Sequence, residues 1–284
     1  LILDRLTSEP TEMSGQYRPA WSPDGTRIAF QSDRGGDGDY DIYVMDADGG
    51  NVQLLTVGSY HHDVDPSWSP DGTRIVYASN RLGGGIGNNN YDLYVSSAVD
   101  LTGLILDRLT SHSARVVDPA WSPDGTRIAF ASNRDGISLD IYVVDADGGN
   151  LTQLTFCNCV DHNPTWSPDG TRIAFTMNVR QRNSWPIDLP EAPDGADWTE
   201  SPRIIERLDY RQDRQGFTDE HYRHLFVIPA DGGTPRQLTD GDWMHTGASW
   251  TSDSRTLLFT SLRVEDAEYE WRETEIYAVD VAGG

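Results

Sequence analysis

Short apolar runs, rich in β-branched and aromatic side chains, recur along the chain between polar turns. Typical runs are "RIAF" at 27–30 and "IYVV" at 141–144. Runs of this kind favour β-strands. The 3.6-residue apolar period of an amphipathic helix is not visible. The pattern therefore predicts an all-β protein.

The polar positions repeat together with the apolar ones. The stretch "WSPDGTRIAF" fills 21–30 and returns unchanged at 121–130 and 166–175, with a near copy at 68–77 and a diverged copy beginning at Trp250. Pro followed by Asp-Gly favours a tight corner, so "SPDG" predicts a turn between two strands. The motif "DADGG" after the second run predicts another reversal of the chain.

Each repeat thus predicts four antiparallel strands, which begin at Trp, at "RIAF", at "IYVV" and before a Leu-Thr pair. Repeated four-stranded units of about 45 residues are typical of propeller blades. Five units open with Trp, which favours a β-propeller of five four-stranded antiparallel blades. Six blades stay possible, because 84 residues separate Trp166 from Trp250 and "APDG" at 192–195 resembles the repeated turn.

The ends of the chain suggest how the propeller closes. We predict one propeller domain over 1–284, with a long insertion at about 177–222. The segment 1–8 is identical to 104–111, which is expected to form the outer strand of the second blade. Because the fifth unit lacks an outer strand, we expect residues 1–7 to complete the last blade and remove an exposed edge. The same exchange between chains would link subunits.

The charge narrows the choice of partners. A formal net charge of −23 repels phosphate backbones, which argues against nucleic-acid binding. The chain has no lysine, which excludes Schiff-base chemistry and Walker-type phosphate loops. No apolar run is long enough to cross a bilayer, and the N-terminus lacks the pattern of a signal peptide. A processed secreted protein would begin in the same way, so the compartment stays open.

Candidate metal ligands gather on one predicted face. In a propeller, the starts of the innermost strands and the loops between second and third strands share a face, here called the loop face. Asp and His side chains around the axis could bind Ca²⁺ or another divalent cation, although no cofactor is certain. The candidates are Asp63, Asp65, Asp118, Asp161, His62 and His162. Alternatively these side chains cap strand starts and pair with Arg34, Arg81 and Arg134 of "SDR" and "SNR".

Two further observations limit the metal hypothesis. The positions three before each repeat Trp differ from blade to blade, so a symmetric ion cage is not expected; they are Arg18, Asp65, Asp118, Asn163 and Gly247. The loop "DRGGDGDYD" lacks the closing Glu of a calcium loop and is expected to be a solvated acidic loop. Its carboxylates are Asp33, Asp37, Asp39 and Asp41.

The chain has two cysteines, Cys157 and Cys159, separated by one residue. A disulfide across such a short span is strained. Two sulfurs are also too few for a closed structural zinc site. We therefore expect two free thiols.

The predicted insertion offers a candidate surface for a partner. Aromatic and apolar side chains on a protruding loop are typical of binding hot spots. Alternatively they fold back over the edge of a blade. The candidates are Trp185, Ile187, Leu189 and Trp198.

The repeat unit "WSPDGTRIAF…SNR…DIYVVDADGG…QLT" resembles the TolB-type propeller repeat over residues 1–175. From about 166 onward, including "SPRIIERLDYRQDRQGFTDEHYRHLFVIPADGGTPRQLTDGDW" at 201–243, the chain is similar to the propeller of prolyl-oligopeptidase-family serine peptidases, especially the acylaminoacyl-peptidase-like branch. In that family the propeller caps an α/β-hydrolase domain. The nucleophile motif G-x-S-x-G is missing here, so no catalytic residue carries over and the chain as given is not expected to be an enzyme.

Three functions stay open, because a fold does not choose between them. The first is a non-catalytic propeller that binds a protein or peptide partner through the loop face, as TolB-type proteins do in the cell envelope. This resemblance favours a periplasmic or extracellular location over a cytoplasmic one. The second is the substrate-gating propeller of a peptidase. The third is a self-assembling subunit linked by exchange of residues 1–7, with calcium as a candidate aid.

Overall fold

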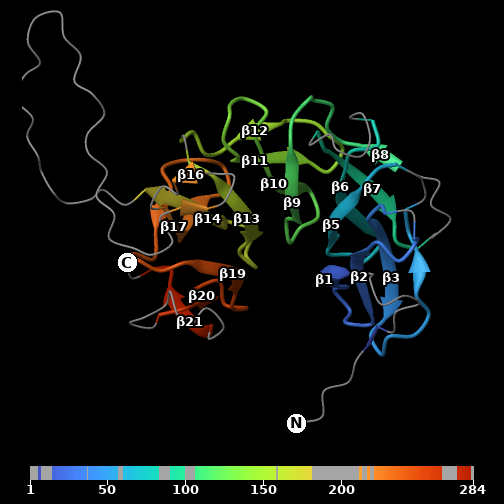
Figure 1. Cartoon of the computed structure of the whole chain (residues 1–284). Coiled ribbons are helices and arrows are strands. Elements are labelled where there is room, and N and C mark those ends of the chain that lie inside the picture. Colours follow the sequence, from blue (N-terminus) through green and yellow to red (C-terminus); the bar gives the residue numbers. More distant parts are fainter. Residues whose placement is uncertain are drawn as a thin grey trace, which may run out of the picture.

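The computed structural model describes most of the chain, and all of its regular structure is β-strand. None of the residues it describes forms a helix that could span a membrane. Five antiparallel sheets follow one another in an arc (Figure 1), which confirms the prediction of an all-β, five-bladed propeller. The described residues are 6–7, 15–36, 38–56, 60–82, 90–99, 106–157, 159–180, 211–212, 216–217, 221–263 and 274–282.

The first three sheets have four strands each, in sequence order from the inside of the arc outward. The first sheet contains β1 (Gln16–Trp21), β2 (Arg27–Ser32), β3 (Asp41–Asp46) and β4 (Gln53–Leu54). The second contains β5 (Asp63–Trp68), β6 (Arg74–Ser79), β7 (Asp92–Ser97) and β8 (Leu106–Arg108). The third contains β9 (Val116–Trp121), β10 (Arg127–Ser132), β11 (Asp140–Asp145) and β12 (Thr152–Gln153).

The last two sheets settle the number of blades. The fourth contains β13 (Asp161–Trp166), β14 (Arg172–Arg180), β17 (His221–Pro229) and β18 (Arg236–Gln237). The fifth contains β19 (His245–Trp250), β20 (Thr256–Ser261) and β21 (Glu275–Asp280), and a small separate sheet pairs β15 (Arg211–Gln212) with β16 (Gly216–Phe217). Because β14 and β17 stay paired out to Arg180 and His221, the insertion belongs to the fourth blade. It lies between these two residues, slightly inside the predicted limits.

The repeated "SPDG" turn is closed by its own side chains. The Ser22 hydroxyl donates to the Asp24 carboxylate at 2.6 Å, and the Thr26 backbone N–H donates to the same oxygen at 3.0 Å. Gly25 has a φ of +69°, a conformation that glycine adopts without strain. The same bonds recur in the next three blades, at Ser69–Asp71, Ser122–Asp124 and Ser167–Asp169.

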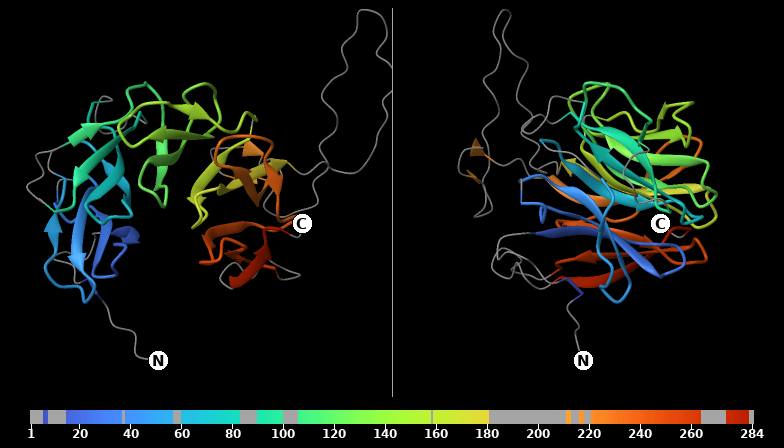
Figure 2. Two further views of the ribbon diagram at one scale, coloured as in Figure 1. Left: turned by 180° about the vertical axis from the view of Figure 1, so that it is seen from behind. Right: turned by 90° about the vertical axis from the view of Figure 1, so that its right-hand side faces the viewer.

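The repeated Trp joins consecutive blades. The Trp68 indole N–H donates to the Ala20 carbonyl of the preceding blade at 3.0 Å, and the Arg27 guanidinium covers its ring at 4.7 Å from the centroid. Trp166 and Trp250 make the equivalent hydrogen bonds. Apolar side chains of neighbouring sheets pack around these rings at the four interfaces between consecutive blades. The repeated residues therefore hold the propeller together and do not form a functional site. Figure 2 shows the resulting arc from behind and from the side.

The described part of the N-terminal segment lies beside the first blade. A Cβ on Gly49 would overlap the carbonyl oxygen of Leu6, and a Cβ on Gly148 would come within 3.1 Å of that of Leu109. Leu109 directly follows β8, the outer strand of the second blade, so Leu6 lies just after the place where the outer strand of a blade preceding the first would end. Among the described strands, those of the first sheet do not contact the fifth. Pairing by 1–5 lies outside the described residues, so completion of the last blade stays a prediction.

Candidate functional site

The strand order fixes which residues share the loop face. All innermost strands start on it, and the connections from second to third strands return to it, while the "SPDG" and "DADGG" turns lie on the opposite face. Six apolar or aromatic side chains on the loop face are more than half exposed. Tyr60 is 77% exposed and Ile137 is 98% exposed. They are Tyr17, Tyr60, Leu82, Ile137, Phe156 and Met244.

Each innermost strand carries a bulge that aims one residue at the centre of the arc. The strand pairing shifts register in all five blades, three residues before the repeat Trp. The residue at the bulge has a positive φ, between 52° and 69°. These residues are Arg18, Asp65, Asp118, Asn163 and Gly247.

Arg18 occupies the centre of this group. Its Nε lies 3.2 Å from the Asp65 carboxylate, its Nη2 lies 3.4 Å from Asp118, and its Nη1 donates to the Asn163 side-chain oxygen at 3.3 Å. One side chain from the first blade therefore contacts the next three blades. The Arg18 side chain is 54% exposed, whereas both carboxylates are largely buried. We call Arg18, Asp65, Asp118, Asn163 and His162 the channel cluster.

The carboxylates of the channel cluster also link neighbouring blades. The Asp118 N–H donates to Asp65, and the Asn163 N–H donates to Asp118. Burial and the neighbouring Asp118 raise the pKa of Asp65, against the effect of Arg18. Burial also opposes ionisation of Asp118, but His162 and Arg18 outweigh it and lower the pKa of that carboxyl. Arg18 thus supplies the positive charge that a metal ion would bring to the predicted ligands Asp65 and Asp118, while the third predicted ligand, His162, lies 3.3 Å from Asp118.

The other predicted ligands lie apart from the channel cluster. Asp63 is buried and pairs with the Arg81 guanidinium at 2.8 Å and with His61 at 3.6 Å. His62 accepts a hydrogen bond from the Tyr40 N–H through Nδ1. Arg81 therefore makes the ion pair that the alternative interpretation expected.

Arg34 of the first blade and Arg134 of the third blade stand at the position of Arg81 but contact aromatic rings. Arg34 and Arg134 stack over pairs of aromatic rings in their own blades, at about 5 Å from the centroids. Neither forms a salt bridge within the described parts of the chain. The expected pairing of these two arginines with strand-start carboxylates is therefore not what the structure shows. Their strand-start counterparts, Gln16 and Val116, carry no charge.

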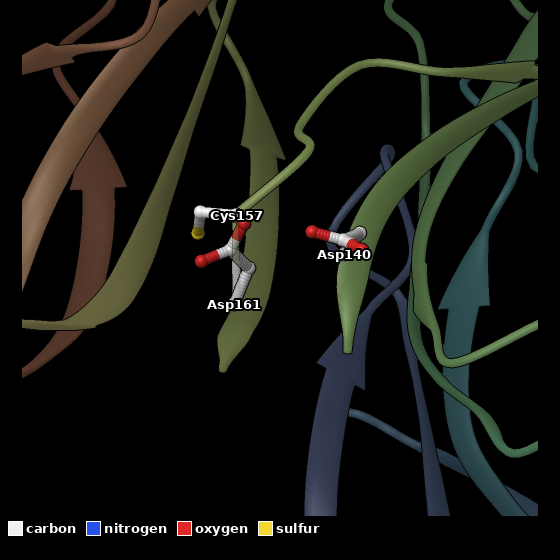
Figure 3. A group of neighbouring side chains, drawn as sticks. All are labelled: Asp140, Cys157 and Asp161. Atoms are coloured by element: carbon white, nitrogen blue, oxygen red, sulfur yellow. The ribbon is translucent and has the colours of Figure 1, made fainter. Parts of the chain in front are cut away.

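Asp161 belongs to a second group, between the third and fourth blades. Its carboxylate lies beside Asp140 and Cys157 (Figure 3), with one ligand atom of each within 4.8 Å of the others. Burial raises the pKa of Asp161 to about 7, and Asp140 adds to this effect. Sequence reasoning missed Asp140 and Cys157 as neighbours of Asp161. The available signal was the replacement of "SNR" by "MNV" at 177–179.

Other predictions have mixed outcomes. Both cysteines are free thiols, as predicted. The expectation of a solvated acidic loop is wrong for Asp39 and Asp41, which are buried: Asp39 accepts a hydrogen bond from the Tyr60 N–H, and Thr56 donates to Asp41. The remaining predicted residues lie outside the described part of the chain; they are Asp37, Trp185, Ile187, Leu189 and Trp198.

Five antiparallel sheets around one centre, each with the repeated Trp and the first four with an "SPDG" turn, define a β-propeller built from repeats. The chain belongs to the TolB beta propeller domain family, whose sequence pattern matches residues 5–86 and 86–187. This match covers more than half of the chain. It includes the Trp, Arg and "SPDG" positions of the first four blades, which hold the blades together.

Two curated relatives match about half of the chain. The uncharacterized peptidase YuxL of Bacillus subtilis is 32% identical over 152 residues, which are 54% of this chain and 22% of that protein. The uncharacterized protein Atu1656 of Agrobacterium fabrum is 34% identical over 136 residues, 47% of this chain and 41% of that protein. The matched part therefore spans less than half of each relative.

Solved structures share the fold. A putative TolB from Agrobacterium tumefaciens superposes with a TM-score of 0.54 at 24% identity, over 78% of this chain and 64% of that one. A puromycin-hydrolyzing peptidase of Mycobacterium tuberculosis superposes with a TM-score of 0.57 at 16% identity, over 95% of this chain and 37% of that one. At these identities the likeness concerns the propeller alone.

Proposed function

We propose that this propeller binds a positively charged segment of a protein or peptide through its loop face. The observation that supports this proposal is the group of six exposed apolar side chains on that face, which includes Tyr60, Ile137 and Phe156. Exposed aromatic and apolar groups brought together on one face are typical of binding surfaces. The net charge of −23 would attract a basic partner and speed its association.

A peptide panel with matched mutants tests this function. Fluorescence anisotropy would compare labelled peptides of equal length that differ only in net charge. We expect the basic peptides to bind, and Tyr60→Ser with Ile137→Ser to weaken that binding by about tenfold or more. Leu151→Ser is the control, because Leu151 is also exposed but lies beside the "DADGG" turn of the opposite face. Equal weakening by the control, or preference for acidic peptides, would contradict the proposal.

A second candidate function is the propeller of a larger peptidase, which limits access to a hydrolase domain. The match to the peptidase YuxL and the shared fold of the puromycin-hydrolyzing peptidase support it. The coding sequence that follows Gly284 would test it. A hydrolase domain with a G-x-S-x-G motif supports this candidate, and a stop codon immediately after Gly284 contradicts it.

The location of the protein is part of the first proposal. We infer a periplasmic or extracellular site of action from the resemblance to TolB-type proteins. Fractionation of the source cells with an antibody against the chain would check it. Recovery only with the cytoplasmic fraction would contradict this inference.

A further inference from the structure

Asp161 is a buried carboxylate that has no counter-charge within the described part of the chain. It opens β13, its side chain is 0% exposed, and neither of its oxygens has a hydrogen-bond partner among the described residues. An ionised carboxylate in such a place is costly unless a cation or several donors compensate it. The fold around Asp161 therefore either keeps this group neutral or receives a positive charge from outside.

The second blade has a carboxylate at the same position, together with a cation that compensates it. Asp63 opens β5 as Asp161 opens β13, and it pairs across the sheet with Ser79 as Asp161 pairs with Met177. There, Arg81 supplies a guanidinium 2.8 Å from the carboxylate. The fourth blade has Val179 at the position of Arg81. The fourth blade therefore has the carboxylate but not the corresponding arginine.

The neighbouring carboxylate, Asp140, also lacks the arginine that its counterpart in the second blade has. Asp140 opens β11 as Asp92 opens β7, and Asp92 pairs with Arg108 at 2.6 Å. The strand registers place Gln153 where the second blade has Arg108. The Gln153 amide donates to Asp140 at 3.1 Å but carries no charge. Two carboxylates thus face each other with no arginine beside them in the described structure.

A sulfur atom completes the group. Cys157 lies between β12 and β13, half-buried, with its Sγ 4.0 Å from the Met177 sulfur. The Cys157 sulfur and one oxygen each of Asp140 and Asp161 lie within 4.8 Å of one another (Figure 3). Three ligands around a tetrahedral zinc ion lie about 3.5 Å apart, so binding would draw these atoms together by about 1 Å.

We propose that Asp140, Cys157 and Asp161 form a binding site for a divalent transition-metal ion of the zinc class, between the third and fourth blades. Thiolate together with carboxylate suits Zn²⁺ or Co²⁺, whereas Ca²⁺ and Mg²⁺ prefer oxygen ligands alone. Three protein ligands leave one position of a tetrahedral ion for water or a ligand. The ion would supply the positive charge that Arg81 and Arg108 supply in the second blade. Its binding releases the thiol proton to solvent.

Cobalt and zinc titrations of the full chain test the site. The protein is stripped with a chelator, kept reduced with a phosphine, and titrated with Co²⁺ or Zn²⁺. We expect one equivalent of Co²⁺ to bind with a thiolate-to-cobalt charge-transfer band, and Zn²⁺ to raise the Tm. Asp161→Asn and Cys157→Ser are each expected to weaken binding by at least about tenfold. Cys159→Ser is the matched control and keeps both the band and the affinity.

Two results would overturn the proposal. One is absence of the charge-transfer band at saturating Co²⁺, and the other is equal metal affinity in Cys157→Ser and the wild type. If Ca²⁺ stabilises the chain independently of Cys157, a carboxylate-only site replaces the one proposed. Alkylation of the wild-type chain, followed by mass spectrometry, keeps the test valid where a variant does not fold. Zn²⁺ is expected to protect Cys157 by more than tenfold relative to Cys159, and equal alkylation of the two would again overturn the proposal.

Discussion

Asp63 shows how its neighbours determine the charge state of a single buried carboxylate. Burial alone would raise the pKa of Asp63, but the nearby His61 and the Arg81 guanidinium, 2.8 Å away, together lower it. Replacing Arg81 by Met leaves the Asp63 charge uncompensated. We expect a loss of about 3–5 kcal/mol in the free energy of unfolding, measured by urea denaturation at pH 7.

The matched control for Arg81→Met is Arg134→Met. Arg134 stacks over Phe130 and Tyr142 but pairs with no carboxylate among the described residues. Its loss is expected to cost only about 1 kcal/mol. Adding Asp63→Asn to Arg81→Met should restore much of the lost stability. Similar losses in the two arginine variants would show that stacking, rather than the ion pair, stabilises this position.

The hydrogen bonds of the repeated turns predict how the stability of the fold changes at low pH. The Ser69 hydroxyl and the Thr73 N–H donate to Asp71 and lower its pKa to about 2, from an unfolded value of about 3.9. Because the folded pKa is the lower one, the turn stabilises the fold fully above about pH 4 and loses this contribution as the pH falls through 2. Carboxyl titration by NMR should show Ser69→Ala raising the pKa of Asp71.

A conservative variant separates this hydrogen bond from other effects of substitution. Ser69→Thr keeps a hydroxyl, and the fifth blade already uses Thr251 to hold Asp253 at 2.6 Å. The pKa of Asp71 should therefore stay near 2 in Ser69→Thr. A pKa of Asp71 that is the same in Ser69→Ala as in the wild type would assign the shift to the two Thr73 donors, its N–H and its hydroxyl.

Two of the repeated Trp residues differ in how they connect one blade to the next. The Trp166 indole N–H donates to Ala120 of the preceding blade, whereas the buried indole N–H of Trp121 has no partner in the described structure. Both rings lie under an arginine. Phe in place of either Trp removes similar apolar area. Trp166→Phe should therefore cost about 1 kcal/mol more than Trp121→Phe, by urea unfolding of both variants. Equal costs would mean that the indole hydrogen bond adds nothing between blades.

Strands and turns could be predicted because the same physical pattern occurs five times. Each "SPDG" turn is closed by its own Ser and Asp, so local sequence is enough to specify it. The group around Asp161 could not be predicted, because Asp140 and Cys157 reach it only when two blades pack. Val179 and Gln153 stand where the second blade has Arg81 and Arg108, and this difference is seen only once the strand registers show which positions correspond.

Across the whole propeller, the channel cluster links four blades through the side chain of Arg18. Alignment of the repeats identified all five bulge positions, including Arg18 and the two carboxylates. It did not predict that Arg18 reaches Asp65, Asp118 and Asn163 together, because this depends on how the blades are placed around the centre. The sequence suggested that this group of residues binds a metal ion, but Arg18 already supplies a positive charge there.

Removing the Arg18 charge should allow Asp65 and Asp118 to bind a metal ion. In Arg18→Gln, Asp65 and Asp118 face each other without a positive charge, and we expect a loss of about 1–2 kcal/mol, reduced because Arg18 is half exposed. Calcium should then raise the Tm of Arg18→Gln by several degrees while leaving the wild type unchanged, as measured by calorimetry at low salt. Arg18→Lys, which keeps the charge, should respond like the wild type. If Ca²⁺ stabilises all three proteins equally, it binds elsewhere, and the central arginine does not act in place of a metal ion.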